Sequence, residues 1–334
     1  MRKLVGSIGL CVVSLVLAGQ VGAEAQRAVV TDDRKPFFPV MLLDQCDGGA
    51  AARAAALGTN VLVDAGCGRR VVRGGRLVGW SYPDEPDNNG WTPAGLAQAF
   101  PRRGTNGRLP RFLTTTPAFY TGPDTRAAAA RTAAFAALAD VAGFDLYPLN
   151  HCRQSLVEVY DAQRRFARLA RGRPTFQWIE TGAIHPGYCG GITVTQAQVT
   201  AEAWLAVAGG ARGIGFFTHT WAPGHSAFAV SPAVQGAIRR FTALAAAIEA
   251  GLTGTTTDAR AGTPAIRVLA RAGGGRTYVI AVNTLTSVVP ATVTVPRLRV
   301  RKMRVVGEGR SVTVYGGKFQ DTFAPLGVHV YASG

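Results

Sequence analysis

An alternation of strand-like and helix-like segments between residues 35 and 251 constrains the fold of this chain more than any other feature. Seven short apolar segments read as buried strands, and helical segments lie between most of them. Strands that alternate with helices of about 10–15 residues predict a parallel sheet built from βαβ units. The expected strands are 37–43, 60–64, 77–82, 111–116, 141–147, 175–179 and 213–218. The expected helices are 50–57, 93–100, 125–139, 156–170, 195–208 and 232–250.

This alternation predicts an α/β fold of the (β/α)8 TIM-barrel type over residues 36–251. Because seven strands are clear, one unit of the barrel is expected to be eroded or replaced by a loop at 66–75, which is rich in glycine and arginine. A doubly wound open sheet has the same local pattern and remains the alternative architecture. Both architectures bind ligands at the carboxyl ends of their strands.

The texture of the sequence changes after residue 257. Short β runs follow one another, separated by turns such as Gly273-Gly274-Gly275 and Gly316-Gly317. This pattern predicts a small antiparallel β-sandwich domain over residues 258–334.

The first 25 residues have the pattern of a secretory signal peptide: two basic residues, a short apolar stretch, and a small-residue cleavage site ending at Ala25. The apolar stretch is short for a membrane span, so we expect a secreted protein without a membrane anchor. Four cysteines follow, and in an exported protein an even number suggests disulfides, although three pairings are possible. We favour Cys46–Cys67 and Cys152–Cys189, because each pair follows two consecutive predicted strands.

The formal net charge of +16 does not by itself predict nucleic-acid binding. Lysine occurs at four positions, and the arginines are scattered through predicted helices and loops, with one dense stretch at 297–304. Scattered arginine fits a compositional bias as well as a binding surface, and the stretch 297–304 is expected to be a solvated strand face, with attraction to an anionic wall polymer as the alternative. The histidines lack the spacing of known metal-binding motifs, so we expect neither a metal nor another cofactor.

Two glutamates are the strongest candidates for chemistry. Glu85 follows the predicted strand 77–82, and Glu180 ends the run 174–180. In a parallel barrel such residues converge on one face, where a pair of carboxyl groups can cleave a glycosidic bond. Partial burial beside Trp80 and Tyr82 would raise the pKa of Glu85 and favour an acid role. Either neighbouring acid, Asp84 or Asp87, could take that role instead. A solvated loop for Glu85 and a structural ion pair for Glu180 are the competing interpretations.

Polar and aromatic residues also cluster at the other strand ends, as sugar-binding sites require. The candidate substrate-binding residues are Asp84, Trp80, Tyr82, Asp145, Tyr147, Trp178, His219 and Trp221.

These motifs together resemble clan A glycoside hydrolases, which have TIM-barrel catalytic domains. The resemblance rests on Asp84-Glu85-Pro86 after Trp80, on Gly143-Phe144-Asp145-Leu146-Tyr147-Pro148, and on Trp178-Ile179-Glu180. It implies that Glu85 is the acid/base from the fourth barrel strand, that Glu180 is the nucleophile from the seventh, and that the anomeric configuration is retained. The family usually has asparagine directly before the acid, where this chain has Asp84.

The resemblance implies a secreted retaining glycoside hydrolase acting on a poly- or oligosaccharide. The alternative is a barrel-derived carbohydrate-binding protein with little or no catalysis.

Overall fold

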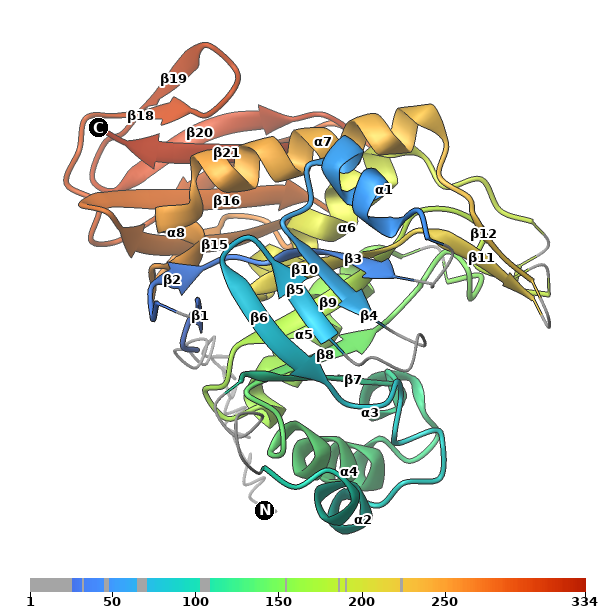
Figure 1. Ribbon diagram of the computed structural model, residues 1–334. Coiled ribbons are helices and arrows are strands. Elements are labelled where there is room, and N and C mark those ends of the chain that lie inside the picture. The colour runs from blue at the N-terminus through green and yellow to red at the C-terminus, as the bar shows by residue number, and fades with distance from the viewer. Residues whose placement is uncertain are drawn as a thin grey trace, which may run out of the picture.

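The computed structural model describes residues 26–334 except 32, 45–47, 65–70, 103–108, 154, 186, 190 and 223–224. The predicted signal peptide lies outside the described residues. In Figure 1, the barrel lies at the centre of the molecule with helices above and below it, and antiparallel sheets from the C-terminal part of the chain pack at the upper left.

The central sheet is a closed barrel of eight strands in the order β10-β3-β4-β5-β6-β7-β8-β9. The sheet closes because β10 pairs in parallel with β9 on one side and with β3 on the other. Ile214 of β10 lies opposite Gln177 of β9 and opposite Val40 of β3. An open doubly wound sheet is therefore excluded, and the barrel prediction is correct. The strands are β3 (Val40–Asp44), β4 (Val61–Asp64), β5 (Val71–Gly74), β6 (Leu77–Ser81), β7 (Arg111–Thr115), β8 (Val141–Asp145), β9 (Thr175–Glu180) and β10 (Gly213–Phe217).

Strand β5 completes the barrel in an unusual direction. It pairs antiparallel with β4, where Val63 faces Val72, and antiparallel with β6, where Val72 faces Gly79. A turn at Gly75 and Arg76 joins it to β6 in place of a helix. Part of the segment expected to be a loop is therefore a strand, and the other barrel strands remain parallel to one another.

Helices cover the outside of the barrel. They are α1 (Ala50–Leu57), α2 (Pro93–Ala99), α3 (Ala118–Thr121), α4 (Thr125–Ala136), α5 (Val157–Leu169), α6 (Gln196–Ala208), α7 (Pro232–Ala247) and α8 (Glu249–Thr253). The N-terminus of α6 is fixed by a capping box, in which the Thr195 and Gln198 side chains each accept a backbone N–H of the other residue. Two short antiparallel pairs flank the barrel: β1 (Val29–Val30) with β2 (Pro36–Phe37), and β11 (His219–Ala222) with β12 (His225–Phe228).

Large aromatic side chains fill the barrel interior, and two glycines make room for them. A Cβ atom at Gly143 would lie 2.2 Å from the Phe176 ring, and one at Gly215 would lie 2.2 Å from the Trp178 ring. Both distances are far inside van der Waals contact, so a side chain at either glycine would displace an aromatic ring from the packed core.

The C-terminal part of the chain forms two antiparallel sheets. One has the order β13-β15-β16-β21-β18-β19 and the other β14-β17-β20. Val279 of the first sheet and Val293 and Phe323 of the second lie in one hydrophobic core. The strands are β13 (Thr255–Thr257), β14 (Arg260–Ala261), β15 (Ile266–Gly273), β16 (Arg276–Asn283), β17 (Val289–Thr294), β18 (Lys302–Val305), β19 (Arg310–Thr313), β20 (Lys318–Phe323) and β21 (Val328–Ser333).

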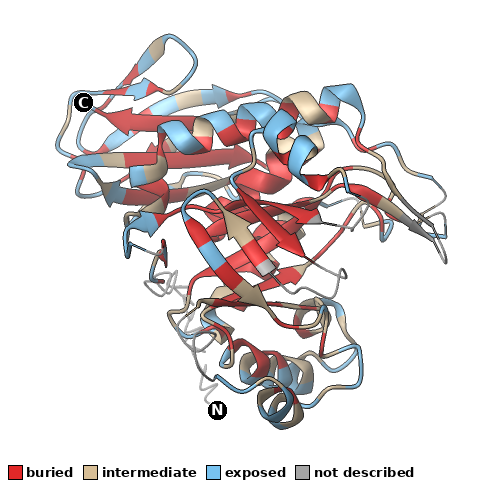
Figure 2. Ribbon diagram, viewed as in Figure 1, coloured by how far each residue is buried: buried red, intermediate tan, exposed pale blue. Residues whose placement is uncertain are grey.

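A second core joins these sheets to the barrel helices. It runs without a break from Trp204 on α6 to Ile280 on β16, and Figure 2 shows the buried layer between the two parts. Arg271 of β15 crosses the same junction with 1% of its surface exposed. Its guanidinium donates hydrogen bonds to the carbonyl oxygens of Leu252, Gly210 and Ala211.

Candidate functional site

Glu85 lies just past β6, which is the fourth barrel strand when β3 is counted as the first. Its φ angle is +40°, a left-handed conformation that costs a residue with a side chain about 1–3 kcal/mol. The turn is held by the backbone N–H groups of Asn88 and Asn89, which donate to the Glu85 carbonyl oxygen at 2.9 and 3.0 Å. The Asn88 side chain donates to the Glu85 carboxylate at 3.2 Å. The hydrogen bonds of this turn therefore hold Glu85 at the strand end in a backbone conformation that is unfavourable for a residue with a side chain.

Asp145, the last residue of β8, shares a hydrogen bond with Glu85. Burial raises the pKa of Asp145 well above its usual value, and the charge of Glu85 raises it further. Among the described residues, the buried Oδ1 atom of Asp145 has no hydrogen-bond donor. Two carboxyl groups in contact can form a hydrogen bond only if one of them keeps its proton, so this hydrogen bond requires one proton between Asp145 and Glu85.

Asp84 adds a third acidic group. Part of its side chain is exposed, but the surrounding protein still excludes enough water to raise its pKa to about 7. The negative charge of Glu85 is the second cause of this rise. The exposed area limits the size of this effect, because solvent screens the charge. Neighbouring Asp87 has a different role: its carboxylate accepts hydrogen bonds from the backbone N–H and the hydroxyl of Thr116, which fix the loop after β6 to the end of β7.

Tyr147, two residues past β8, lies within reach of all these acids. It is 8% exposed, and burial raises the pKa of its hydroxyl well above the usual value. Negative charge on Asp145, Asp84, Glu85 and Glu180 raises it further. The charges of carboxyl groups at the ends of β6, β8 and β9 therefore all act on one tyrosine.

Glu180 ends β9, the seventh barrel strand, and has no exposed surface. Its carboxylate accepts hydrogen bonds from the backbone N–H of Leu149 at 2.8 Å and from that of Asn150 at 2.9 Å. The Asn150 side-chain amide is a third donor. Burial raises the pKa of Glu180, and these hydrogen bonds oppose the shift because they stabilise the ionised form. No arginine pairs with Glu180 among the described residues, so the structural ion pair is not what holds it.

Asn150 fixes the segment around Glu180. Its side chain also donates to the carbonyl oxygen of Gly182 at 3.0 Å and accepts the backbone N–H of Ile184 at 2.9 Å. Asn150 thereby ties the loop after β8 to the loop after β9.

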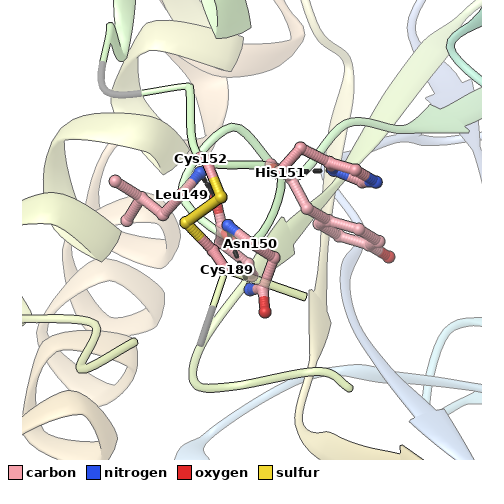
Figure 3. Close-up of a disulfide and its surroundings, with 7 residues drawn as sticks. Leu149, Asn150, His151, Cys152 and Cys189 are labelled. Carbon is pink, nitrogen blue, oxygen red and sulfur yellow. Dashed lines mark hydrogen bonds between the residues drawn. A yellow bond between two sulfur atoms is a disulfide. The ribbon is translucent and has the colours of Figure 1, made fainter. Parts of the chain in front are cut away.

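The disulfide between Cys152 and Cys189 joins the same two loops, as Figure 3 shows beside Leu149 and Asn150. Its Cα atoms are 5.2 Å apart, within the usual range. This pairing was predicted from the sequence and is confirmed. The other predicted pair, Cys46 with Cys67, lies outside the described residues.

Trp80 and Tyr82 do not lie with the acids. Their rings are 5.1 Å apart and contact Phe100, and the Arg111 guanidinium is 5.0 Å from the Trp80 ring. Successive side chains of a strand point to opposite faces. Tyr82 shares a core with Leu96 of α2, so this cluster occupies the layer between barrel and helices.

The remaining candidates are also enclosed. Trp178 is 3% exposed inside the barrel, where its indole N–H donates to the Thr114 hydroxyl at 3.0 Å. His219 is 2% exposed, with its Nδ1 atom 3.2 Å from the Thr218 hydroxyl. The side chain of Trp221 lies outside the described residues.

The sequence analysis missed Glu202, the one charged residue of α6, which has no exposed surface. It forms a hydrogen bond with Glu180. An isolated glutamate in the apolar run 199–208 was the available signal, because such a residue is rarely buried without a partner.

Within the described part of the chain, no group of three or more histidine, cysteine, aspartate or glutamate side chains is arranged to hold a metal ion. The helices described there include none that is long and apolar enough to cross a membrane.

Comparison with solved structures finds distant likenesses to glycoside hydrolases. A GH30 endoxylanase from Clostridium papyrosolvens C71 is 15% identical, with a TM-score of 0.44 over 76% of this chain and 64% of that one. An α-amylase from Geobacillus thermoleovorans, complexed with acarbose, is 15% identical, with a TM-score of 0.46 over 72% of this chain and 55% of that one. A maltogenic α-amylase from Thermotoga neapolitana is 11% identical, with a TM-score of 0.47 over 72% and 57%.

This chain thus spans between about half and two thirds of the length of these enzymes. No family model and no curated protein matches the sequence.

Proposed function

We propose that this protein hydrolyses glycosidic bonds in a poly- or oligosaccharide, using carboxyl groups at the carboxyl end of the barrel strands. The position of Tyr147 is the observation that supports this most. Acidic groups from three barrel strands act on its hydroxyl, so Glu85 and Glu180 lie near a common point. A carboxyl group whose pKa is raised by burial and by a neighbouring acid, as that of Asp145 is, is suited to proton transfer at a glycosidic oxygen.

In this proposal Glu85 is the acid/base and Glu180 the nucleophile. The proton held between Glu85 and Asp145 passes to the glycosidic oxygen as the bond to the leaving sugar breaks. The Glu180 carboxylate attacks the anomeric carbon and forms a glycosyl ester. Glu85 then removes a proton from a water molecule, the water attacks the same carbon, and Glu180 is released with the anomeric configuration retained.

Asp145 is the competing candidate for the second carboxyl group. Two carboxyl groups that flank a sugar in a retaining enzyme stand about 5–5.5 Å apart, whereas Asp145 is in hydrogen-bond contact with Glu85. That contact leaves no room for a sugar ring between them, which favours Glu180. Because Glu180 has no exposed surface, the proposal requires the segment at Leu149 and Asn150 to shift when sugar binds.

The proposal includes secretion. A disulfide that joins two loops beside the candidate site is compatible with an oxidising compartment. A polysaccharide outside the cell is then the expected substrate class.

The test is covalent trapping. The protein is incubated with activated 2-deoxy-2-fluoro glycosides of several sugars, and labelled peptides are mapped by mass spectrometry. We expect the label on Glu180 and its loss in Glu180→Gln. Glu85→Gln should slow hydrolysis of substrates with poor leaving groups more than that of substrates with good ones. Glu158→Gln, on the outer helix α5, is the matched control.

Label on Asp145 or Glu85 would keep the enzyme class and overturn the assignment of Glu180. Absence of turnover and label across the panel, with glycan binding that survives Glu180→Gln, would instead favour the carbohydrate-binding protein.

A further inference from the structure

Glu202 is a buried acid without a cation. Helix α6 carries it on a segment whose other residues from Ala201 to Ala208 are apolar and buried. Among the described residues, neither of its carboxyl oxygens has a hydrogen-bond donor. Its contact is with Glu180, by a hydrogen bond between the two carboxyl groups.

The direction of that hydrogen bond follows from the donors present. Glu180 already accepts three N–H groups, from Leu149 and Asn150, and these stabilise its ionised form. Glu202 accepts none within the described chain. A carboxylate can only accept, so Glu202 must keep its proton and donate it to Glu180. If both carboxyl groups were ionised, two buried negative charges would repel each other with neither solvent nor, in the described part of the chain, a cation to offset the repulsion.

Among the described residues, Glu180 is the charged group that acts on Glu202. The elements packed against α6 include α5, α7, β9, β10, β15, β16 and β21. Of their titratable groups, Glu180 on β9 is the one that acts on Glu202. The arginines of α5, α7 and β15 form no ion pair with either acid in the described part of the chain. Tyr147, beyond the end of β8, is the next titratable group on which Glu180 acts.

We infer that Glu202 is a positioning residue for Glu180: its protonated carboxyl group donates the hydrogen bond that, with those from Leu149 and Asn150, fixes the Glu180 carboxylate. The mechanistic part of this inference rests on the proposed function. The shared proton and the fixing of Glu180 do not.

The pH dependence of stability tests the proton. Burial, followed by the charge of Glu180, raises the pKa of Glu202 well above its ordinary value of 4.5. The folded protein then holds a proton that the unfolded chain loses above about pH 4.5, so this contribution to stability falls as pH rises through that window. The Glu202→Gln variant keeps a donor and cannot ionise. Its equilibrium constant for unfolding should therefore fall relative to wild type as pH rises above about 4.5, with a limiting slope of about tenfold per pH unit.

Amide hydrogen exchange tests the positioning. The N–H groups of Leu149 and Asn150 donate to Glu180, so their protection reports how firmly it is fixed. Glu202→Gln should keep that protection, whereas Glu202→Leu, which removes the donor, should lower it about tenfold or more. Glu158→Gln is the matched control, since the Glu158 carboxylate pairs with Arg153 and not with Glu180.

If trapping identifies a glycosidase, Glu202→Gln should keep the wild-type kcat. Glu202→Leu should have a much lower kcat, and its dependence of kcat on pH should be shifted from that of wild type. Unfolding constants of wild type and Glu202→Gln that keep a fixed ratio from pH 5 to 8 would overturn the shared proton. Equal protection of the two amides in the Gln and Leu variants would overturn the positioning role. A protein without turnover that still gives both expected physical results would refute the proposed function and leave the positioning intact.

Discussion

Replacing Asn150 with alanine tests how the candidate site is held together. The side chain is 1% exposed and makes hydrogen bonds to Glu180, to the Gly182 carbonyl oxygen and to the Ile184 N–H. The Asn150→Ala change removes one of the three N–H donors of Glu180, and it leaves the Gly182 carbonyl oxygen and the Ile184 N–H without the Asn150 side chain. Each buried hydrogen bond lost in this way costs about 1–3 kcal/mol. We expect a loss of about 4 kcal/mol in the free energy of unfolding, which is about a thousandfold change in the equilibrium constant.

The assay is urea unfolding at pH 7, followed by far-UV circular dichroism with the disulfide intact. Asn89→Ala is the matched control, because Asn89 makes one exposed hydrogen bond, to the Asp84 carbonyl oxygen at 2.9 Å. That variant should lose about 1 kcal/mol or less. A loss for Asn150→Ala no larger than that of the control would refute the reasoning, because it would mean that the three buried partners find other donors and acceptors.

Asn150→Asp separates hydrogen bonding from shape. The substitution keeps the volume of the side chain but turns the donor toward Glu180 into an acceptor, so two carboxylates face each other above neutral pH. Its destabilisation should be larger at pH 8 than at pH 4, where a proton can be shared. Equal losses at the two pH values would contradict the placement of the amide nitrogen beside Glu180.

Three further predictions concern the same fold. Removing the disulfide by Cys152→Ser with Cys189→Ser should lower the free energy of unfolding by up to about 4 kcal/mol, the chain-entropy value for a sequence separation of 37, as measured by urea unfolding; an unchanged midpoint would refute it. Arg271→Met should cost about 2–4 kcal/mol, because three buried carbonyl oxygens lose a charged donor, whereas the exposed control Arg276→Met should cost little. Asp84→Asn should gain stability relative to wild type as pH rises from about 4 to 7. The folded-state pKa of Asp84 is raised to about 7, so ionisation of this group destabilises wild type across that range. Curves of stability against pH that run parallel for the two proteins would contradict the raised pKa.

Local sequence pattern was sufficient for the βαβ part of the fold. The seven predicted strands all correspond to barrel strands, because a buried parallel strand is a continuous apolar run that can be recognised without its neighbours. Strand β5 was missed, since it has four residues, contains Arg73 and Gly74, and is held by pairing on both sides. A turn rather than a helix connects β5 to β6, so the strand–helix alternation that indicated the other strands is absent here.

The candidate site was predictable in part. Glu85 and Glu180 follow strands that are easy to recognise, so their arrival at the same end of the barrel could be inferred from parallel direction alone. Trp80 and Tyr82 were also near a strand end, but their side chains point toward the helices. The position of a residue near a strand end does not show which face of the sheet its side chain is on. That face follows from the alternation of side chains along the strand, together with the residues that pack on each face.

The sequence by itself determined the order of seven of the eight barrel strands and the carboxylates at their ends, and it favoured the pairing of Cys152 with Cys189 among the three pairings that it allows. These follow from local periodicity and from the neighbourhood of consecutive strands. Only the tertiary structure decided that the sheet closes, that Asn150 binds Glu180 and that Glu202 shares a proton with it. Closure depends on a hydrogen-bonded register between β3 and β10, and the proton depends on burial, which exists only when α6 has packed against the barrel.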